Sequence, residues 1–282
     1  MKKAISIALG LLIVIGSISA SIIGAFPFWY SFYVVGAFML FGGLNYKQGK
    51  SSVYALILDH KWAVFVSVYM AAVIFGFLVD IIFGRTIADL WYYPHLGKLG
   101  GIFFPVLFYY PFGGFQIYEL YYLLESILTQ KIPSNSHRVI NKKIKNDIAN
   151  ILIIFLIIGV VLPFLNFFIN QNKFANELVT IFIILTIFSS DALFYKLSEK
   201  SILFDVFEGK IATIITMIIT WFVATVLTEI PNTFSWEWIY HKVPFVSMEI
   251  FKINALVFTA GWFFLVFFPI RLIDIIMFYR RK

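Results

Sequence analysis

The sequence predicts an all-α polytopic membrane protein with eight transmembrane helices, arranged as two parallel four-helix repeats with both termini in the cytoplasm. Three observations predict it: long apolar blocks, the placement of Lys and Arg, and an internal repeat at an offset of 147 residues. Of the 282 residues, 61% are apolar and 13% are charged, and the mean hydropathy is +0.90. A soluble domain has roughly 25% charged residues.

The apolar residues form blocks that are long enough to cross a bilayer, for which a helix needs about 20 residues. Backbone polar groups cannot stay unpaired in hydrocarbon, and ten-residue alternating strands are absent, so the blocks are expected to be helices. The predicted spans are residues 4–24, 28–46, 62–83, 100–124, 149–169, 177–195, 210–228 and 250–272.

The placement of the basic residues sets the predicted topology. With the N-terminus inside, 17 of the 22 Lys and Arg residues fall in cytoplasmic segments and five fall outside. This is the positive-inside pattern. The net charge of +7 therefore indicates topology and contact with anionic membrane lipids, not a nucleic-acid partner. Richness in Ile, Phe and Lys suggests a prokaryote, hence a multi-pass protein of the plasma (inner) membrane.

Each span of the first half recurs 147 residues later, and so do parts of two outside loops and an inner amphipathic segment. Residues 54–59 correspond to 201–206. The matched loop residues are Thr86 and Thr233, Trp91 and Trp238, and Tyr93 and Tyr240. An even number of spans per half gives both halves the same orientation, so the repeats are parallel and a site is expected near their common axis.

The repeat divides the chain into a first unit at 1–130, a polar cytoplasmic linker at 131–145 and a second unit at 146–282. The N-terminus also has the form of a secretory signal peptide: two lysines, an apolar run and small residues up to Ala20. Because residues 4–24 correspond to a span at 151–171, we expect this segment to be retained. The alternative, cleavage, would leave seven spans.

Two outside loops, at 84–95 and 229–241, combine acids, a histidine and clustered aromatic residues. The aromatic residues alone could form an interfacial belt. Asp89 and Glu237 lie beside tryptophans, however, and a carboxyl desolvated by indoles has a raised pKa and can act as a proton donor. Aromatic faces stabilise a developing cation. The combination is typical of protonation-initiated isoprenoid cyclisation. The alternative for both acids is a solvated carboxylate at the interface.

Charged residues within the predicted spans are expected to face the bundle interior or a partner. Glu119 fits an ion pair or a protonated hydrogen bond as well as a functional role. Arg85 is expected to pair with Asp80 or Asp89, and Asp191 to snorkel to the inner surface.

The sequence predicts no metal site and no cofactor. Cysteine is absent, which excludes thiolate nucleophiles and cysteine-based metal sites. No two of the four histidines share a helix turn, although His95 and His241 could meet if the loops do, joined by Glu229 or Glu237. Phosphate-loop, nucleophile-elbow and dinucleotide patterns are also absent.

Both loops resemble parts of known families. Trp91-Tyr92-Tyr93-Pro94, after Asp89, resembles the Trp-x-Tyr-x-Pro region of integral-membrane lycopene cyclases, although their Pro-x-Glu-Glu signature is missing. The segment at 235–240, with Asn232 before it, is similar to the Asn…Trp-Glu-x-x-Tyr segment of fungal membrane-bound terpene cyclases. The resemblance implies metal-free, proton-initiated cyclisation of an isoprenoid, with Glu237 as an acid. It also implies a pocket lined by Trp91, Tyr93, Trp236 and Tyr240.

The sequence therefore predicts an outward-facing site between the two loops that acts on an apolar, isoprenoid-like lipid, with Glu237 and Asp89 as catalytic acids. The expected substrate-binding residues are Trp91, Tyr93, His95, Asn232, Trp236, Trp238, Tyr240 and His241. The expected supporting residues are Asp80, Arg85, Glu119 and Glu229. The alternatives are a transporter or lipid-binding protein without enzymatic activity, and a structural membrane subunit.

Overall fold

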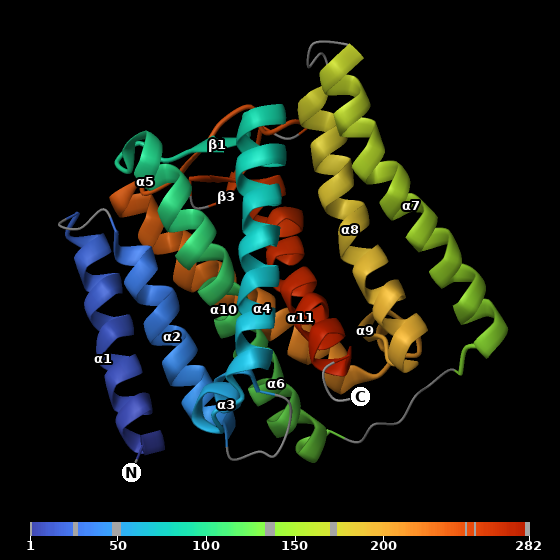
Figure 1. The fold of residues 1–282 in the computed structure, drawn as a ribbon, viewed down its shortest axis with the longest axis horizontal. Helices are drawn as coiled ribbons and strands as arrows, with labels where there is room; N and C mark the ends of the chain where they lie inside the picture. The colour runs from blue at the N-terminus through green and yellow to red at the C-terminus, as the bar shows by residue number, and fades with distance from the viewer. Residues whose placement is uncertain are drawn as a thin grey trace.

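The computed structural model is almost wholly helical (Figure 1). It describes residues 2–24, 28–46, 52–132, 139–169, 174–245, 247–250 and 252–279. Part of the predicted linker, at 133–138, lies outside these ranges. The helices are α1 (Lys2–Ile22), α2 (Trp29–Asn45), α3 (Val53–Leu58), α4 (Trp62–Gly76), α5 (Gly97–Phe104), α6 (Tyr110–Lys131), α7 (Lys142–Ile169), α8 (Ala175–Ser198), α9 (Ile202–Phe207), α10 (Ile211–Ser235) and α11 (Trp262–Tyr279).

Three π-helical segments continue α-helices near the same end of the molecule. They are η2 (Phe77–Ile87) after α4, η3 (Pro105–Tyr109) between α5 and α6, and η4 (Val257–Gly261) before α11. Four two-residue strands complete the structure: β1 (Trp91–Tyr92), β2 (Ile239–Tyr240), β3 (Glu249–Ile250) and β4 (Ile253–Asn254).

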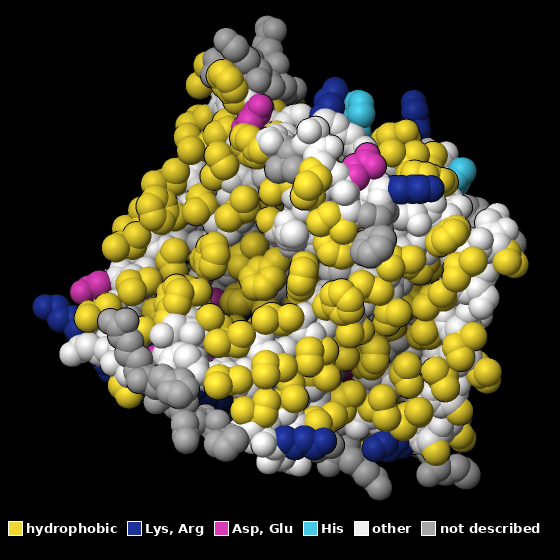
Figure 2. All heavy atoms as spheres, turned by 180° about the vertical axis from the view of Figure 1, so that it is seen from behind, with side chains coloured by type: hydrophobic (Ala, Val, Ile, Leu, Met, Phe, Trp, Pro, Cys, Tyr) yellow, Lys and Arg dark blue, Asp and Glu magenta, His cyan; other side chains and the backbone are white. Residues whose placement is uncertain are grey.

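Six helices are long and apolar enough to cross a membrane, so the chain is a multi-pass membrane protein. They are Lys3–Ile22, Trp62–Ile87, Lys142–Ile169, Ala175–Ser198, Ile211–Ser235 and Val257–Tyr279. The other two predicted spans correspond to α2, which has 17 residues, and to the α5–η3–α6 rod. In Figure 2 the middle of the surface is hydrophobic, and charged side chains gather towards its upper and lower edges.

The helices form two outer pairs around a central group. Figure 1 shows α1 with α2 on one side and α7 with α8 on the other, with α4, α6, α10 and α11 between them. Contacts between the halves come in matched pairs. The contact of α1 with α10 corresponds to that of α7 with η2, and the contact of α10 with α6 corresponds to that of α4 with α11. A two-fold axis generates this pattern when residues 147 apart exchange places.

As predicted, the two outside loops meet. Strands β1 and β2 pair antiparallel, with Trp91 opposite Tyr240 and Tyr92 opposite Ile239. The His241 amide extends the ladder by donating to the Leu90 carbonyl at 2.7 Å. Because Tyr92 and Ile239 are themselves 147 residues apart, the ladder is centred on equivalent positions.

The two amphipathic segments at the other end of the molecule are the short helices α3 and α9. Each begins after a serine whose side chain accepts from the third residue on, Ser52 from the Ala55 amide and Ser201 from the Phe204 amide. These caps match at an offset of 149, not 147. The predicted alignment of 54–59 with 201–206 is therefore wrong by two residues.

Buried acids attach these short helices to the bundle. Glu119 accepts hydrogen bonds from Asn45 Nδ2 (2.7 Å), Ser52 Oγ (2.9 Å) and the Tyr54 amide (2.8 Å). It thereby joins α6 to α3, at the end away from the outside loops, and supports the fold rather than the predicted site.

Asp191 does the same for α9, by accepting from Ser201 Oγ and the Ile202 amide. It also pairs with Arg271 at 2.6 Å and is fully buried, so the expectation that it snorkels is wrong.

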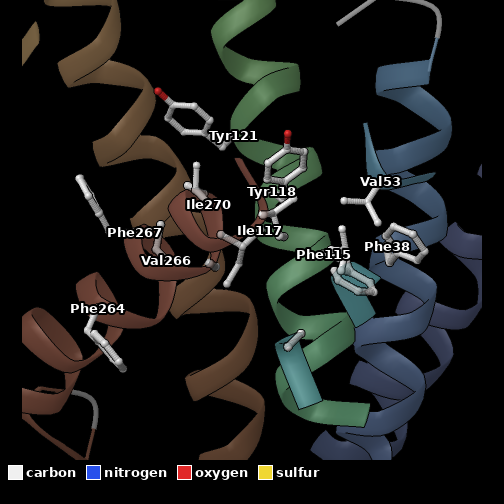
Figure 3. Close-up of a cluster of buried hydrophobic side chains, with 14 of the residues drawn as sticks. Phe38, Val53, Phe115, Ile117, Tyr118, Tyr121, Phe264, Val266, Phe267 and Ile270 are labelled. Carbon is white, nitrogen blue, oxygen red and sulfur yellow. The ribbon is translucent and has the colours of Figure 1, made fainter. Parts of the chain in front are cut away.

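The hydrophobic core joins the halves along α6 and α11. Figure 3 shows Ile117 and Tyr118 of α6 on the side of Val266 and Ile270 of α11, and Phe115 on the opposite side of α6 beside Phe38. All of these side chains are buried. This contact holds together the two helices between which the cavity described below is formed.

Helices α1 and α2 approach closely because glycines lie at their contact. A Cβ added to Gly10 would lie 2.6 Å from the Leu40 nitrogen and 2.7 Å from the Gly36 oxygen, whereas one added to Gly16 would meet nothing within 4 Å. Small residues permit this approach in membranes, where packing takes the place of the hydrophobic effect.

Gly10→Ala is expected to push α1 away from α2 and to destabilise the protein by roughly 1–3 kcal/mol, as overpacking does. The measurement is thermal unfolding in detergent. Gly16→Ala, on the same helix, is the matched control and should leave the Tm unchanged or slightly raised, because alanine favours helix. Equal Tm values for the two variants would contradict the close contact.

Candidate functional site

A cavity of about 150 Å³ lies beneath the β1–β2 ladder, between α6 and the η4–α11 rod, and its wall is mainly apolar and aromatic. Both halves contribute equivalent positions to it, which places it on the axis that relates them. The lining pairs that are 147 residues apart are Trp91 and Trp238, Tyr93 and Tyr240, Tyr109 and Leu256, Tyr110 and Val257, Gly113 and Ala260, Gly114 and Gly261, and Ile117 and Phe264.

Asp80 of η2 lies behind one part of this wall. It is fully buried and accepts hydrogen bonds from Trp91 Nε1 (2.7 Å), Tyr93 OH (2.8 Å) and Arg85 Nη2 (2.6 Å). The predicted ion pair of Arg85 with Asp80 is thus confirmed. Arg85 also donates to the Gly101 carbonyl at 2.6 Å. The guanidinium and two further donors offset part of the cost of burying this carboxyl.

The Trp91 indole can reach Asp80 because the residue that its ring contacts, Gly84, has no side chain. A Cβ on Gly84 would lie 2.2 Å from the Trp91 ring. The Gly84 carbonyl also accepts from the Leu90 amide at 2.7 Å, which turns the chain from η2 into β1. The loop is therefore folded back onto its own helix before it pairs with the second half.

Glu229 of α10 occupies a comparable place behind the wall from the other half. Its Oε1 accepts from Trp262 Nε1 at 2.6 Å and from the hydroxyl of Tyr240, which in turn accepts from Trp238 Nε1 at 3.1 Å. Its Oε2 is buried and has no partner among the described residues, and no cation pairs with it in that part of the chain. A buried carboxyl without a counter-ion favours its neutral form.

Glu237 follows α10 and is also fully buried. It accepts from the Tyr30 amide at 3.1 Å, at the start of α2, and from the hydroxyl of Tyr109, which lines the cavity. Burial raises the pKa of Glu237 from 4.5 to about 8, although these hydrogen bonds lower it in part. The predicted rise in the pKa is therefore supported.

Of the two flanking indoles, only Trp238 is buried, in the same cluster as Tyr30 and Tyr109, whereas Trp236 is exposed and does not cover Glu237. Trp236 has a left-handed backbone (φ 52°) and a side chain that is 43% exposed. Trp238 stacks on Trp29, with ring centroids 6.3 Å apart. The desolvation comes from α2 and η3, which were not part of the prediction.

Asp89 does not behave as a buried acid, so that expectation is wrong. Its side chain is 49% exposed and pairs with Lys242 Nζ at 2.7 Å and His241 Nδ1 at 3.3 Å. The hydrogen bond from Lys242 is the main reason that the pKa of Asp89 is lowered. Asp89 is therefore a carboxylate at neutral pH and not a proton donor.

The other predicted binding residues fall into two groups. Trp91, Tyr93, Trp238 and Tyr240 line the cavity. Asn232 instead holds the turn, because its amide donates to the Trp238 carbonyl at 3.0 Å and accepts from the Trp238 amide at 3.2 Å.

His95, Trp236 and His241 are exposed and do not line the cavity, and His241 meets Tyr92 and Asp89 rather than His95. Sequence reasoning had placed all three in the pocket because they share loops with residues that do line it.

Several lining residues were missed because they lie within predicted spans: Tyr30, Tyr109, Tyr110 and Trp262. A signal for them existed. Phenols and indoles usually gather at the interface, so Tyr109, Tyr110 and Trp262 within apolar runs indicate hydrogen-bond partners inside the bundle. The partners could not be read from the sequence, because they come from distant loops.

Three buried carboxyls, those of Asp80, Glu229 and Glu237, are arranged in the same way around the cavity. Each is separated from the cavity by aromatic side chains of the wall, to which it is hydrogen-bonded. Within the described ranges, no group of three or more His, Cys, Asp or Glu residues is placed to hold a metal ion. No family model, curated protein or solved structure matches the chain.

The raised pKa of Glu237 makes stability depend on pH with a defined sign. The folded protein holds this proton more tightly than the unfolded chain, so the contribution is complete below about pH 4.5 and is lost as pH rises through about 8. The Tm of the wild type should therefore fall relative to that of Glu237→Gln between pH 5 and pH 9. Asp89→Asn is the control: it keeps Glu237, and the pKa of Asp89 is lowered, so its Tm should fall with pH in parallel with that of the wild type. Parallel curves for wild type and Glu237→Gln would contradict the assignment.

Proposed function

We propose that the chain spans the membrane eight times, as two parallel four-helix repeats, and that the cavity on their axis binds an apolar, isoprenoid-like lipid and converts it by acid chemistry. The matched contacts between the halves and the ladder centred on equivalent residues support the architecture. The positive-inside pattern supports cytoplasmic termini in the plasma membrane of a prokaryote.

The observation that carries the chemical proposal is the set of buried carboxyls behind an aromatic wall. In a low-dielectric cavity, such a wall stabilises positive charge through the faces of its rings, and a carboxylate behind a phenol or an indole strengthens the effect. Asp80 is held charged by Arg85 and supplies that field. Glu229 has no counter-ion among the described residues and supplies a proton.

The reaction proposed is an isomerisation in which all atoms balance. In the acid form of Glu229 the hydrogen bond to Tyr240 is reversed, with the proton on the carboxyl. The Tyr240 hydroxyl then gives its own proton to a carbon–carbon double bond and takes that of Glu229, leaving a carbocation and a carboxylate. A second double bond of the same molecule attacks the cation and closes a ring. Loss of a proton to the Tyr240–Glu229 pair then forms a new double bond. No oxidant or metal takes part.

Glu237 offers a second route, because Tyr109 links it to the cavity. Its carboxyl also caps α2, so its main role is to hold the turn before β2 and to keep Tyr109 in place. The resemblance to lycopene and terpene cyclases assigned the acid to Glu237, and Glu229 now takes the leading role because both of its hydrogen-bond donors line the cavity.

Mass spectrometry of lipids extracted from the purified protein tests for the ligand. A specific isoprenoid should be recovered in addition to phospholipid. Gly261→Leu should displace it, because Gly261 lines the cavity and a Cβ there would make only ordinary contacts, the nearest at 3.7 Å to Val257. Recovery of phospholipid alone from the wild type would refute the binding site.

Conversion is tested by incubating the protein with the recovered lipid in D₂O. Deuterium should appear at one carbon of the product. Glu229→Gln should lower its incorporation by about 100-fold or more, as expected for loss of a general acid. Asp89→Asn is the matched control and should stay near the wild-type rate, because this carboxylate is exposed and paired. A bound lipid without deuterium uptake would refute the enzyme and favour the alternative, a lipid-binding protein or a transporter in which Glu229 carries a coupling proton.

The proposed topology is tested with single cysteines, since the natural chain has none. Lys98→Cys, beside the outside loops, should react with an impermeant maleimide in intact cells. Lys143→Cys, in the cytoplasmic segment, should react only after permeabilisation. The reverse pattern would show that the termini face outwards.

A further inference from the structure

The cavity wall is closed on one side of the axis and open on the other. On the closed side, Tyr30, Tyr109 and Gly113 of α2, η3 and α6 are buried. On the open side, Thr180 is buried, but its neighbours Ile184 of α8 and Leu256, Val257 and Ala260 are only half-buried. The open side lies between α8 and the η4–α11 rod, both of which are long and apolar enough to cross a membrane, so we expect it to face lipid.

The closed side is sealed by aromatic rings. Tyr30 packs edge-on against Tyr109, with ring centroids 5.0 Å apart, and stacks on Tyr33, with ring centroids 5.8 Å apart. The hydrogen bond of Tyr109 to Glu237 holds this seal from the loop above. A Cβ on Gly113 would lie 3.4 Å from the Tyr30 hydroxyl, so the ring lies directly against the backbone of α6.

The open side has smaller side chains at the equivalent positions. The positions 147 residues after Tyr33, Tyr109 and Tyr110 are occupied by Thr180, Leu256 and Val257. All three of these smaller residues line the cavity. The Thr180 hydroxyl is satisfied within its own helix, since it donates to the Asn176 carbonyl at 2.7 Å. The rim therefore presents an apolar surface.

We propose that this gap is a lateral portal, formed by Thr180, Ile184, Leu256, Val257 and Ala260, through which an apolar molecule passes between the bilayer and the cavity. Its π-helical side, η4, is a segment of the kind often found at functional sites. The inference rests on the proposed function only in taking the cavity as the site. It adds that the ligand comes from the lipid phase and crosses only the α8–η4 side.

The portal is tested with a small apolar photoreactive probe, trifluoromethyl-iodophenyl-diazirine, which partitions into bilayers. After irradiation of the protein in vesicles, labelled residues are mapped by peptide mass spectrometry. In the wild type, label should appear on the inner wall at residues 113–117, in addition to the lipid-facing surface of α7. The α7 label, for example at Ile154 (55% exposed), serves as the internal reference.

Transferring the aromatic seal to the open side should close the portal. The double variant Thr180→Tyr with Leu256→Tyr should lose label at 113–117 and keep it on α7, and Leu256→Tyr alone gives a milder test should the double variant fold poorly. Ile181→Tyr is the matched control, because this neighbour of Thr180 is 44% exposed and lies outside the cavity wall. It should keep the wild-type labelling.

Two results would overturn the proposal. Absence of label at 113–117 in the wild type would mean that the cavity is not reached from lipid. Label there that survives in both tyrosine variants would mean that the probe enters elsewhere. Neither result depends on catalysis, since the probe is not a substrate. A failed deuterium assay would leave the portal standing.

Discussion

The carboxyls of Asp80, Glu229 and Glu237 must find hydrogen-bond donors where the bilayer supplies no water, and most of the structure around the cavity meets that need. Each unpaired polar group in such surroundings costs several kcal/mol, so the donors must come from the protein itself. They come from tryptophan and tyrosine side chains and from the start of a helix. Because these donors lie in the outside loops and on neighbouring helices, satisfying the acids also fixes the loops over the cavity.

The two halves solve this problem differently, although they share one fold. Asp80 has a guanidinium beside it as a counter-ion. Glu229 depends on a phenol and an indole and keeps one oxygen free of partners among the described residues. Under the proposed function, the two halves thus supply one charged carboxylate and one exchangeable proton on opposite sides of the cavity. The same divergence gives the wall an aromatic seal on one side and small side chains on the other.

The inner end of the molecule uses acids for a purely structural purpose. Glu119 and Asp191 each accept from the first amides and the capping serine of a six-residue helix, α3 and α9. Such short helices are unstable alone. Their attachment to α6 and α8 holds them at the end of the bundle away from the outside loops. Buried acids within apolar runs therefore have two roles in this chain. Those near the outside loops surround the cavity, and those at the opposite end attach short helices to the bundle.

Sequence alone determined the helical membrane class, most of the span positions and the meeting of the two aromatic loops, because hydrophobic length and an internal repeat are properties of the chain itself. It did not determine which acid in those loops is buried. Asp89 and Glu237 both lie next to tryptophan, yet Asp89 is equivalent to Trp236, and both residues have left-handed backbones and exposed side chains. Glu237 is equivalent to Leu90, and both are buried. Only the tertiary structure decided this, because a one-residue shift at a turn reverses the direction of a side chain, and the partners that desolvate it come from helices distant in sequence.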